Sequence, residues 1–133
     1  MHISNSKVLA REHTYILLSR VSHLEPTFPI APKQSPLSST ISVIQIGPIS
    51  GAELMNVMLA VYDDSKHLGM KAVGFVDGVT DVDFSVDEED ERWRRICIDG
   101  DIVTLEKGGT IEAQVCEGIS LENGLTLIIS CYI

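Results

Sequence analysis

Carboxylates are the side chains of this sequence whose number and spacing come nearest to a chemical site. The chain of 133 residues has nineteen aspartates and glutamates, and the stretch DGVTDVDFSVDEED (77–90) concentrates them. Calcium is held by six to eight oxygen ligands, so Asp77, Asp81 and Asp83 are candidate metal ligands. Their spacing differs from the calcium loop of an EF-hand, which has acids at every second position. We therefore predict at most a weak cation site there, and no cofactor.

Cysteine and histidine, the usual partners in nucleophilic catalysis, follow no catalytic motif. Cys97, Cys116 and Cys131 each lie within an apolar segment, and none belongs to a Cys-x-x-Cys pair. A nucleophilic cysteine needs a nearby base, and His67 is the only histidine outside the N-terminal 23 residues. We expect buried free thiols and no enzymatic activity. The alternative is a small enzyme that uses a cysteine or two carboxylates in a dry cleft.

The acidic stretch continues into three arginines, and its spacing predicts a short helix. Ser85 and Glu88 match a capping box, and Trp93 lies seven residues after Val86, on the same helical face. Acids precede bases by four residues in three pairs: Glu88 with Arg92, Asp90 with Arg94, and Glu91 with Arg95. We therefore expect two helical turns anchored by Trp93. The alternative is a solvated acidic loop whose arginines bind a partner.

The size and charge of the chain indicate a single folded domain that does not bind nucleic acids or anionic membranes. A chain of 133 residues with 44% hydrophobic content fits one folded domain, and the 5% aromatic content requires an aliphatic core. The net charge is −9, and it is uneven: residues 1–40 carry four bases and two acids, whereas residues 41–133 carry six bases and seventeen acids. The acidic body should repel nucleic acids and anionic membranes.

Apolar runs in the sequence are too short to cross a membrane. The longest are LMNVMLAVY (54–62) and LTLIISCYI (125–133), against the roughly 20 residues that a spanning helix needs. The N-terminus lacks the small-residue cleavage pattern of a signal peptide, and an odd number of cysteines argues against a disulfide framework. We expect an intracellular, cytoplasmic protein without a transmembrane segment.

Prolines mark the N-terminal third of the chain. Four of the five lie in LEPTFPIAPKQSPLSST (24–40), and proline restricts both itself and the preceding residue to extended conformations. This composition predicts an extended Pro-rich arm and connector over 1–40, followed by a β domain over 41–133. Pro26, Pro29 and Pro32 are then candidate contacts with a partner. The alternative is a loop lying on its own domain.

Alternating and β-branched segments dominate the rest of the chain. TISVIQI (40–46) predicts a strand, and KAVGFVD (71–77) predicts another that ends at a turn. Glycine turns should join antiparallel neighbours. These turns are Asp77-Gly78, Asp99-Gly100, Lys107-Gly108-Gly109 and Asn123-Gly124. In TIEAQV (110–115), Ile111, Ala113 and Val115 share one face, as in a half-buried strand.

Residues 51–67 carry conflicting signals. Ser50 and Glu53 match a capping box, which favours a helix over 51–67. Strand-like alternation favours a strand over 54–62 instead. The alternating residues are Met55, Val57, Leu59 and Val61. Because the remaining chain is so strongly β, we predict a strand over 54–62.

These elements together predict a mainly β fold: an antiparallel β-sandwich or barrel, jelly-roll-like, with one or two short helices and the Pro-rich N-terminal arm. The last strand, LTLIISCYI (125–133), has bulky residues on both faces. It should lie either centrally between two layers or at an oligomer contact. Leu127, Ile129 and Tyr132 are therefore candidate partner contacts.

Two short motifs stand out in the body of the chain: LAVYDDSK (59–66), which follows PISGAE (48–53), and CEGISLENGLTLIIS (116–130). Together they resemble the core of plant-virus cell-to-cell movement proteins. The family has a strand ending in Asp-x-Arg; Asp63 or Asp64 would supply the aspartate, and Lys66 replaces the arginine. The resemblance covers about residues 41–133 and implies a virus-encoded β-sandwich, although the chain lacks a basic nucleic-acid-binding region.

The functional expectation is a non-enzymatic β domain that acts by self-association or by binding another protein. It depends on the absence of a catalytic motif, the Pro-rich segment and the apolar last strand. A homo-oligomer or a protein partner is expected, and a virus-encoded coat-, matrix- or movement-protein-like structural protein is one form that this function would take. The alternatives are the small enzyme described above and a calcium- or ligand-binding module formed by the acidic loop.

Overall fold

The structure, a computed structural model, describes residues 2–3, 12–116 and 126–132. Its elements are β1 (His2–Ile3), β2 (Tyr15–Ser19), β3 (Ile41–Ile46), α1 (Gly51–Tyr62), η1 (Lys66–Gly69), β4 (Val73–Val79), β5 (Asp81–Ser85), η2 (Glu91–Trp93), β6 (Arg95–Ile98), β7 (Asp101–Thr104), β8 (Thr110–Cys116) and β9 (Thr126–Tyr132). They form three antiparallel sheets, with strand orders β2-β3-β4, β1-β5-β8-β9 and β6-β7. The fold is therefore mainly β, as predicted, and none of the sheets closes into a barrel.

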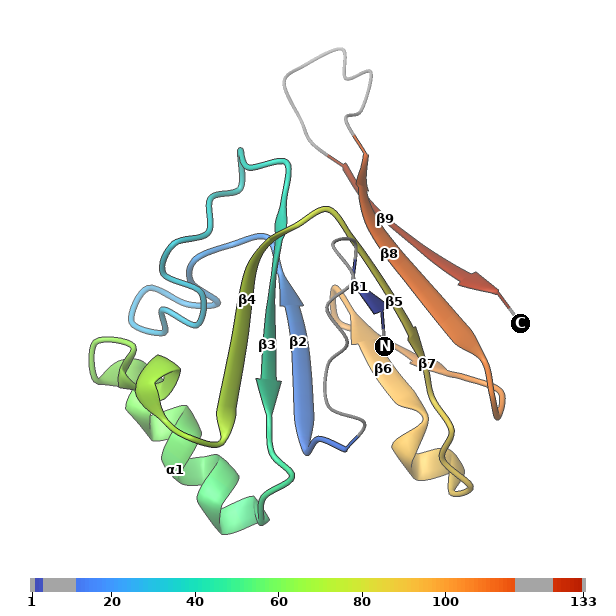
Figure 1. Ribbon diagram of the computed structural model, residues 1–133, viewed down its shortest axis with the longest axis horizontal. Helices are drawn as coiled ribbons and strands as arrows, with labels where there is room; N and C mark the ends of the chain where they lie inside the picture. The colour runs from blue at the N-terminus through green and yellow to red at the C-terminus, as the bar shows by residue number, and fades with distance from the viewer. Residues whose placement is uncertain (1, 4–11, 117–125, 133) are drawn as a thin grey trace.

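Strand β3 lies between two apolar layers. All six of its residues are buried. Ile44 and Ile46 join a cluster with Val57 of α1. On the opposite face Val43 packs with Val82 of β5. Because successive side chains of a strand point to opposite faces, this one strand connects both clusters. Figure 1 shows the resulting order, with α1 on one side of the β2-β3-β4 sheet and the four-stranded sheet on the other.

Strands β4 and β5 carry the chain from one sheet to the other, with Thr80 alone between them. The predicted turn at Asp77-Gly78 is wrong, because β4 continues through it to Val79. The register of β3 against β4 shifts at this point. Gly78 has φ 73°, and the Ser42 hydroxyl donates a hydrogen bond to Asp77 Oδ1 at 2.8 Å. Gly78 therefore allows a bulge-like irregularity in the pairing of β3 with β4, and it does not form a hairpin turn.

Of the antiparallel pairs that glycine turns predicted in the C-terminal half, β6-β7 and β8-β9 form and β7-β8 does not. The turn at Asn123-Gly124 itself lies outside the described residues. Asp99 and Gly100 have φ of 48° and 96° and join β6 to β7, as predicted. β7 and β8 were expected to pair, but β8 pairs with β5 and β9. The reason is local: the Val86 amide donates to the Gly109 carbonyl, and the Gly108 amide donates to the Val86 carbonyl. These bonds extend the ladder between β5 and β8.

Strand β9 lies at an edge of its sheet. Among the described strands it pairs with β8 alone. The two predicted alternatives, a place between two layers or an oligomer contact, concern the faces of this strand, whose side chains lie outside the description. The backbone register places Leu127 opposite Val115, Ile129 opposite Ala113 and Tyr132 opposite Thr110. Ile111 and Ala113 of β8 are buried on one face, as their alternation predicted.

The prediction of a strand over 54–62 is wrong, because these residues form most of helix α1. The Ser50 side chain accepts from the Glu53 amide, and the Glu53 carboxylate accepts from the Ser50 amide, so the capping box is complete. Val57 and Val61 are buried against the sheet. Val57 and Val61 are four residues apart, which fits the helical period of 3.6 residues, and this signal outweighs the two-residue alternation typical of a strand. The helix ends at Tyr62, five residues before the helical alternative would have ended.

The Pro-rich segment is packed on its own domain, which is the second of the two alternatives given above. Ile30 and Ala31 are 1% and 0% exposed, and they belong to the same core cluster as Ile44 and Val57. Upstream, β2 pairs with β3 over five residue pairs. The division proposed after residue 40 therefore separates residues that share one core, and the segment is not an extended arm.

The stretch 86–95 does not form the predicted two-turn helix. A single 3-10 turn occurs at Glu91–Trp93, and Trp93 is 68% exposed, so this side chain does not anchor the turn. Arg92 pairs with Asp90, two residues away. Arg94 donates instead to the carbonyls of Glu88, Glu89 and Leu105. Because these backbone acceptors come from two segments, spacing within the stretch could not predict them.

Candidate functional site

The three candidate metal ligands do not converge. Asp77 Oδ1 accepts from Ser42 and from the Gly78 amide. Asp81 Oδ1 accepts from the Thr80 hydroxyl at 3.0 Å. Asp83 is exposed on β5. Throughout the described residues, no three His, Cys, Asp or Glu side chains are grouped as metal ligands would be. The acidic stretch therefore provides no geometric basis for a cation site in this part of the chain.

Cys97 is the cysteine whose side chain the structure describes, and it is exposed, whereas a buried thiol was predicted. It is a free thiol on β6. Burial of Tyr15 raises the pKa of that tyrosine, and an electrostatic interaction with Cys97 raises it further. The side chains of Cys116 and Cys131 lie outside the described residues. His67 is fully buried on η1, where its Nε2 lies 3.0 Å from the Ile30 carbonyl. The geometry places His67 in a packing role and gives no pairing with Cys97.

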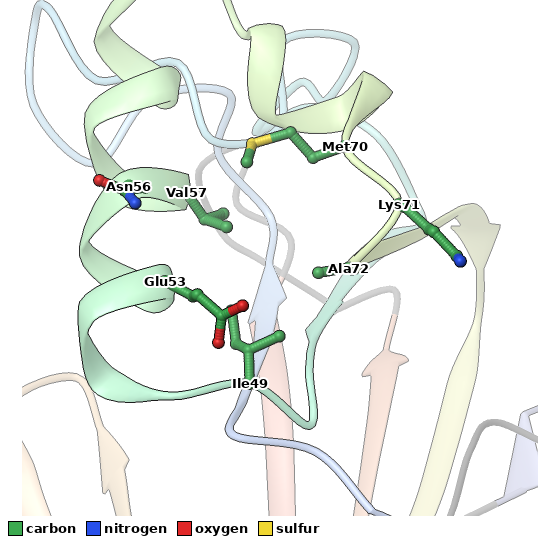
Figure 2. A pocket seen from close by; sticks show the side chains of 7 residues that line it. All are labelled: Ile49, Glu53, Asn56, Val57, Met70, Lys71 and Ala72. Carbon is green, nitrogen blue, oxygen red and sulfur yellow. The ribbon is translucent and has the colours of Figure 1, made fainter.

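A shallow hollow of about 250 Å³ lies between α1 and the connection from η1 to β4. Figure 2 shows Val57 and Met70 pointing toward each other, with Ile49 and Ala72 below them. The Glu53 carboxylate beside the hollow already accepts from Ser50, and these bonds lower the pKa of Glu53. Most of the lining is apolar; Asn56 and Lys71 also border the hollow, and Figure 2 shows the Lys71 side chain pointing away from it. Because the Glu53 carboxylate serves the helix cap, no pair of titratable side chains converges in this hollow.

Helix α1 exposes a stripe of large apolar side chains on its far side from the sheet. Met55, Leu59 and Tyr62 are 60%, 59% and 52% exposed. They are spaced i, i+4 and i+7, so they share one face of the helix, which we call the α1 outer face. A helix that covers one sheet normally shows a polar outer face. Packing within the described part of the chain does not explain the exposure of Met55 and Leu59 on this face.

Negative charge gathers at the C-terminal end of the α1 outer face. The Tyr62 hydroxyl donates to Glu25 Oε1 at 2.5 Å, and this bond raises the pKa of Tyr62. Asp63 and Asp64 follow immediately, and Lys66 pairs with Asp63 at 2.6 Å. The last turn of α1 holds no basic residue. Since the C-terminus of a helix carries a partial negative charge, these carboxylates add to an already negative field.

The α1 outer face borders the Pro-rich segment, which is held to the end of the helix by four contacts. Besides the bond from Tyr62 to Glu25, the rings of Tyr62 and Phe28 meet edge to face at 4.8 Å between centroids. The Ser65 hydroxyl donates to the Pro29 carbonyl at 2.9 Å, and His67 contacts the Ile30 carbonyl. These contacts fix the C-terminal end of α1 against the Pro-rich segment.

The candidate partner contacts from the sequence are not residues of the α1 outer face: three lie in the Pro-rich segment that borders it, and the side chains of the other three lie outside the description. Pro26 and Pro32 are exposed, and Pro29 is half-buried with its carbonyl bonded to Ser65. For the candidates on β9, the structure describes the backbone and not the side chains. Sequence reasoning missed the α1 outer face because its residues were assigned to a strand. The spacing of Met55, Leu59 and Tyr62, combined with the capping box, was the signal that could have identified it.

A second group of exposed apolar side chains lies on the β6-β7 hairpin and the turn before it. Ile102 is 71% exposed and Trp93 68%, and all four residues of β7 are exposed. Among the described strands, β6 and β7 pair only with each other. A two-stranded hairpin with free edges is a surface to which another strand can add.

No protein-family model, no curated protein and no solved structure matches this chain. The resemblance to movement proteins required a strand ending at Asp63 or Asp64, and the structure has helix α1 leading to these residues. Neither the comparisons with known proteins nor the geometry therefore supports membership of that family. Within the described residues, no helix is long and apolar enough to cross a membrane.

Proposed function

We propose that this chain is a non-catalytic domain that binds another protein through the α1 outer face. The observation that carries the proposal is the exposure of Met55, Leu59 and Tyr62 along one helical stripe. Each is more than half exposed, so none gains much from burial in the isolated chain. Apolar side chains arranged in a stripe are what a partner helix buries when it packs on another helix.

Selection of helical peptides displayed on cells tests this function on the full-length chain. We expect peptides with an apolar stripe to be enriched, and the variant Met55→Gln/Leu59→Gln to bind them about tenfold or more weakly. Glutamine favours helices, so the variant should melt within a few degrees of the original chain. The matched control is Leu37→Gln/Ile102→Gln, which alters two other exposed apolar side chains. Absence of enrichment, or equal loss in both variants, would exclude the α1 outer face.

Self-association through the β6-β7 hairpin is a second candidate function. It is favoured by the exposure of Ile102 and by the free strand edges of the hairpin in the described sheets. Sedimentation at micromolar concentration should then show a dimer or larger species that Ile102→Lys converts to monomer, since lysine opposes edge pairing. A chain that is monomeric throughout the concentration range would eliminate this candidate and leave the α1 proposal standing.

A further inference from the structure

We infer that the partner of the α1 outer face is a basic amphipathic helix, an inference that rests on the function proposed above. Its apolar side would cover Met55, Leu59 and Tyr62, and its lysines or arginines would lie toward the C-terminal end of α1.

The secondary structure of the partner follows from what α1 can offer. The backbone amides and carbonyls in the middle of an α-helix are bonded within the helix, so a partner strand finds no free edge there. Only side chains remain for contact. Met55 and Leu59 are four residues apart and Leu59 and Tyr62 three apart, the two spacings that form ridges on a helix, and such ridges fit into the grooves of a second helix. A helical partner buries the whole stripe.

The charge of the partner follows from the residues beside Tyr62. Three carboxylates, those of Glu25, Asp63 and Asp64, stand against the single ammonium of Lys66. The pair between Lys66 and Asp63 is exposed on both sides, so it neutralises the site only weakly. The negative end of the helix dipole adds to the imbalance, because the last turn has no basic residue. A cationic side chain on the partner would meet carboxylates of which, among the described residues, only Asp63 has an ion pair.

A second copy of the chain fits this surface poorly. Each copy carries a net charge of −9 and presents the same carboxylates. Pairing two α1 outer faces would therefore add repulsion to apolar contact, whereas a basic helix gains from both. Charge complementarity also predicts that binding weakens as salt rises, because these carboxylates are exposed.

Two synthetic peptides of about 20 residues, long enough to be helical, test the inference on the full chain. They share one leucine and methionine stripe, and the other positions are lysine and arginine in one peptide and glutamate in the other. We expect the basic peptide to bind about tenfold more tightly by fluorescence anisotropy at low salt. Glu25→Gln/Asp64→Asn should weaken that binding about threefold to tenfold and reduce its salt dependence. The amide of the glutamine can still accept from Tyr62.

The matched control is Asp101→Asn/Glu106→Gln, which removes the same number of exposed charges from the β7 region. Equal binding of the two peptides, or equal weakening by both charge variants, would overturn the basic partner and leave protein binding by the α1 outer face intact. Failure of both peptides to bind, or binding that Met55→Gln/Leu59→Gln does not weaken, would remove both proposals. Tighter binding of the acidic peptide would overturn the inference alone.

Discussion

Replacing Ile30 by alanine is expected to destabilise the whole domain by about 2–4 kcal/mol. Ile30 is 1% exposed although it lies in the Pro-rich segment, and it packs in the cluster that contains Ile44, Val57 and Val61. Truncation removes buried methyl groups and leaves a cavity between the segment, the helix and the sheet. Urea denaturation followed by circular dichroism measures the change in the free energy of unfolding.

Leu37→Ala is the matched control, because Leu37 lies in the same segment and is 81% exposed. It should change the free energy of unfolding by no more than about 0.5 kcal/mol. Should Ile30→Ala prove as mild as Leu37→Ala, the segment would be a detachable arm, as its proline content first suggested. A single cooperative transition with a large loss for Ile30→Ala alone would show that residues 12–116 unfold as one unit.

The parts of the fold that local chemistry controls were predictable. TISVIQI became β3 because β-branched residues fill both faces of a strand that lies between two layers. Asp99-Gly100 formed a hairpin turn because both residues adopt positive φ. Proline content, by contrast, predicted an extended arm, whereas residues 24–40 form mostly turns and bends and pack on the domain. Burial of Ile30 depends on α1 and β3, which lie elsewhere in the chain.

Helix α1 shows why the period of a pattern can mislead. Met55, Val57, Leu59 and Val61 alternate as in a strand, but the helix buries only the two valines. The alternation was produced by two different causes, core packing for Val57 and Val61 and an exposed stripe for Met55 and Leu59. The surface proposed for binding has apolar residues where a solvent-facing helix would have polar ones. The wrong element and the overlooked site thus have the same origin.

The candidate site was therefore less predictable than the fold. Acid-rich spacing directed attention to Asp77, Asp81 and Asp83, yet each of the first two is bonded to a neighbouring hydroxyl. Sequence spacing did not predict the carboxylate group beside Tyr62, because Glu25 is 37 residues away in the chain and is brought to Tyr62 by the packing of the Pro-rich segment. Residues gathered by tertiary contacts leave no spacing signal.

His67→Ala is expected to cost about 2–4 kcal/mol of unfolding free energy at neutral pH. The side chain is 0% exposed, and its Nε2 is the hydrogen-bonding partner of the Ile30 carbonyl. Truncation leaves both a cavity and a buried carbonyl without that donor. His23→Ala is the matched control, because His23 is exposed, and it should be nearly neutral. Equal losses in the two variants would exclude a structural role for His67.

The same histidine should make stability depend on pH in a defined direction. Burial lowers the pKa of His67 below its ordinary value of 6.5, and the bond to the Ile30 carbonyl opposes this only in part. Below about pH 6.5 the unfolded chain therefore binds a proton that the folded chain excludes, so the free energy of unfolding falls as the pH falls. Above that pH both states are neutral at this position and the contribution is constant. Urea midpoints at pH 7.5 and 5.5 should differ less in His67→Ala than in the original chain, whereas His23→Ala should retain the full difference. If His67→Ala kept that difference, the proton uptake would have to occur at other groups, and the buried imidazole would be a packing element without influence on the response of the fold to acid.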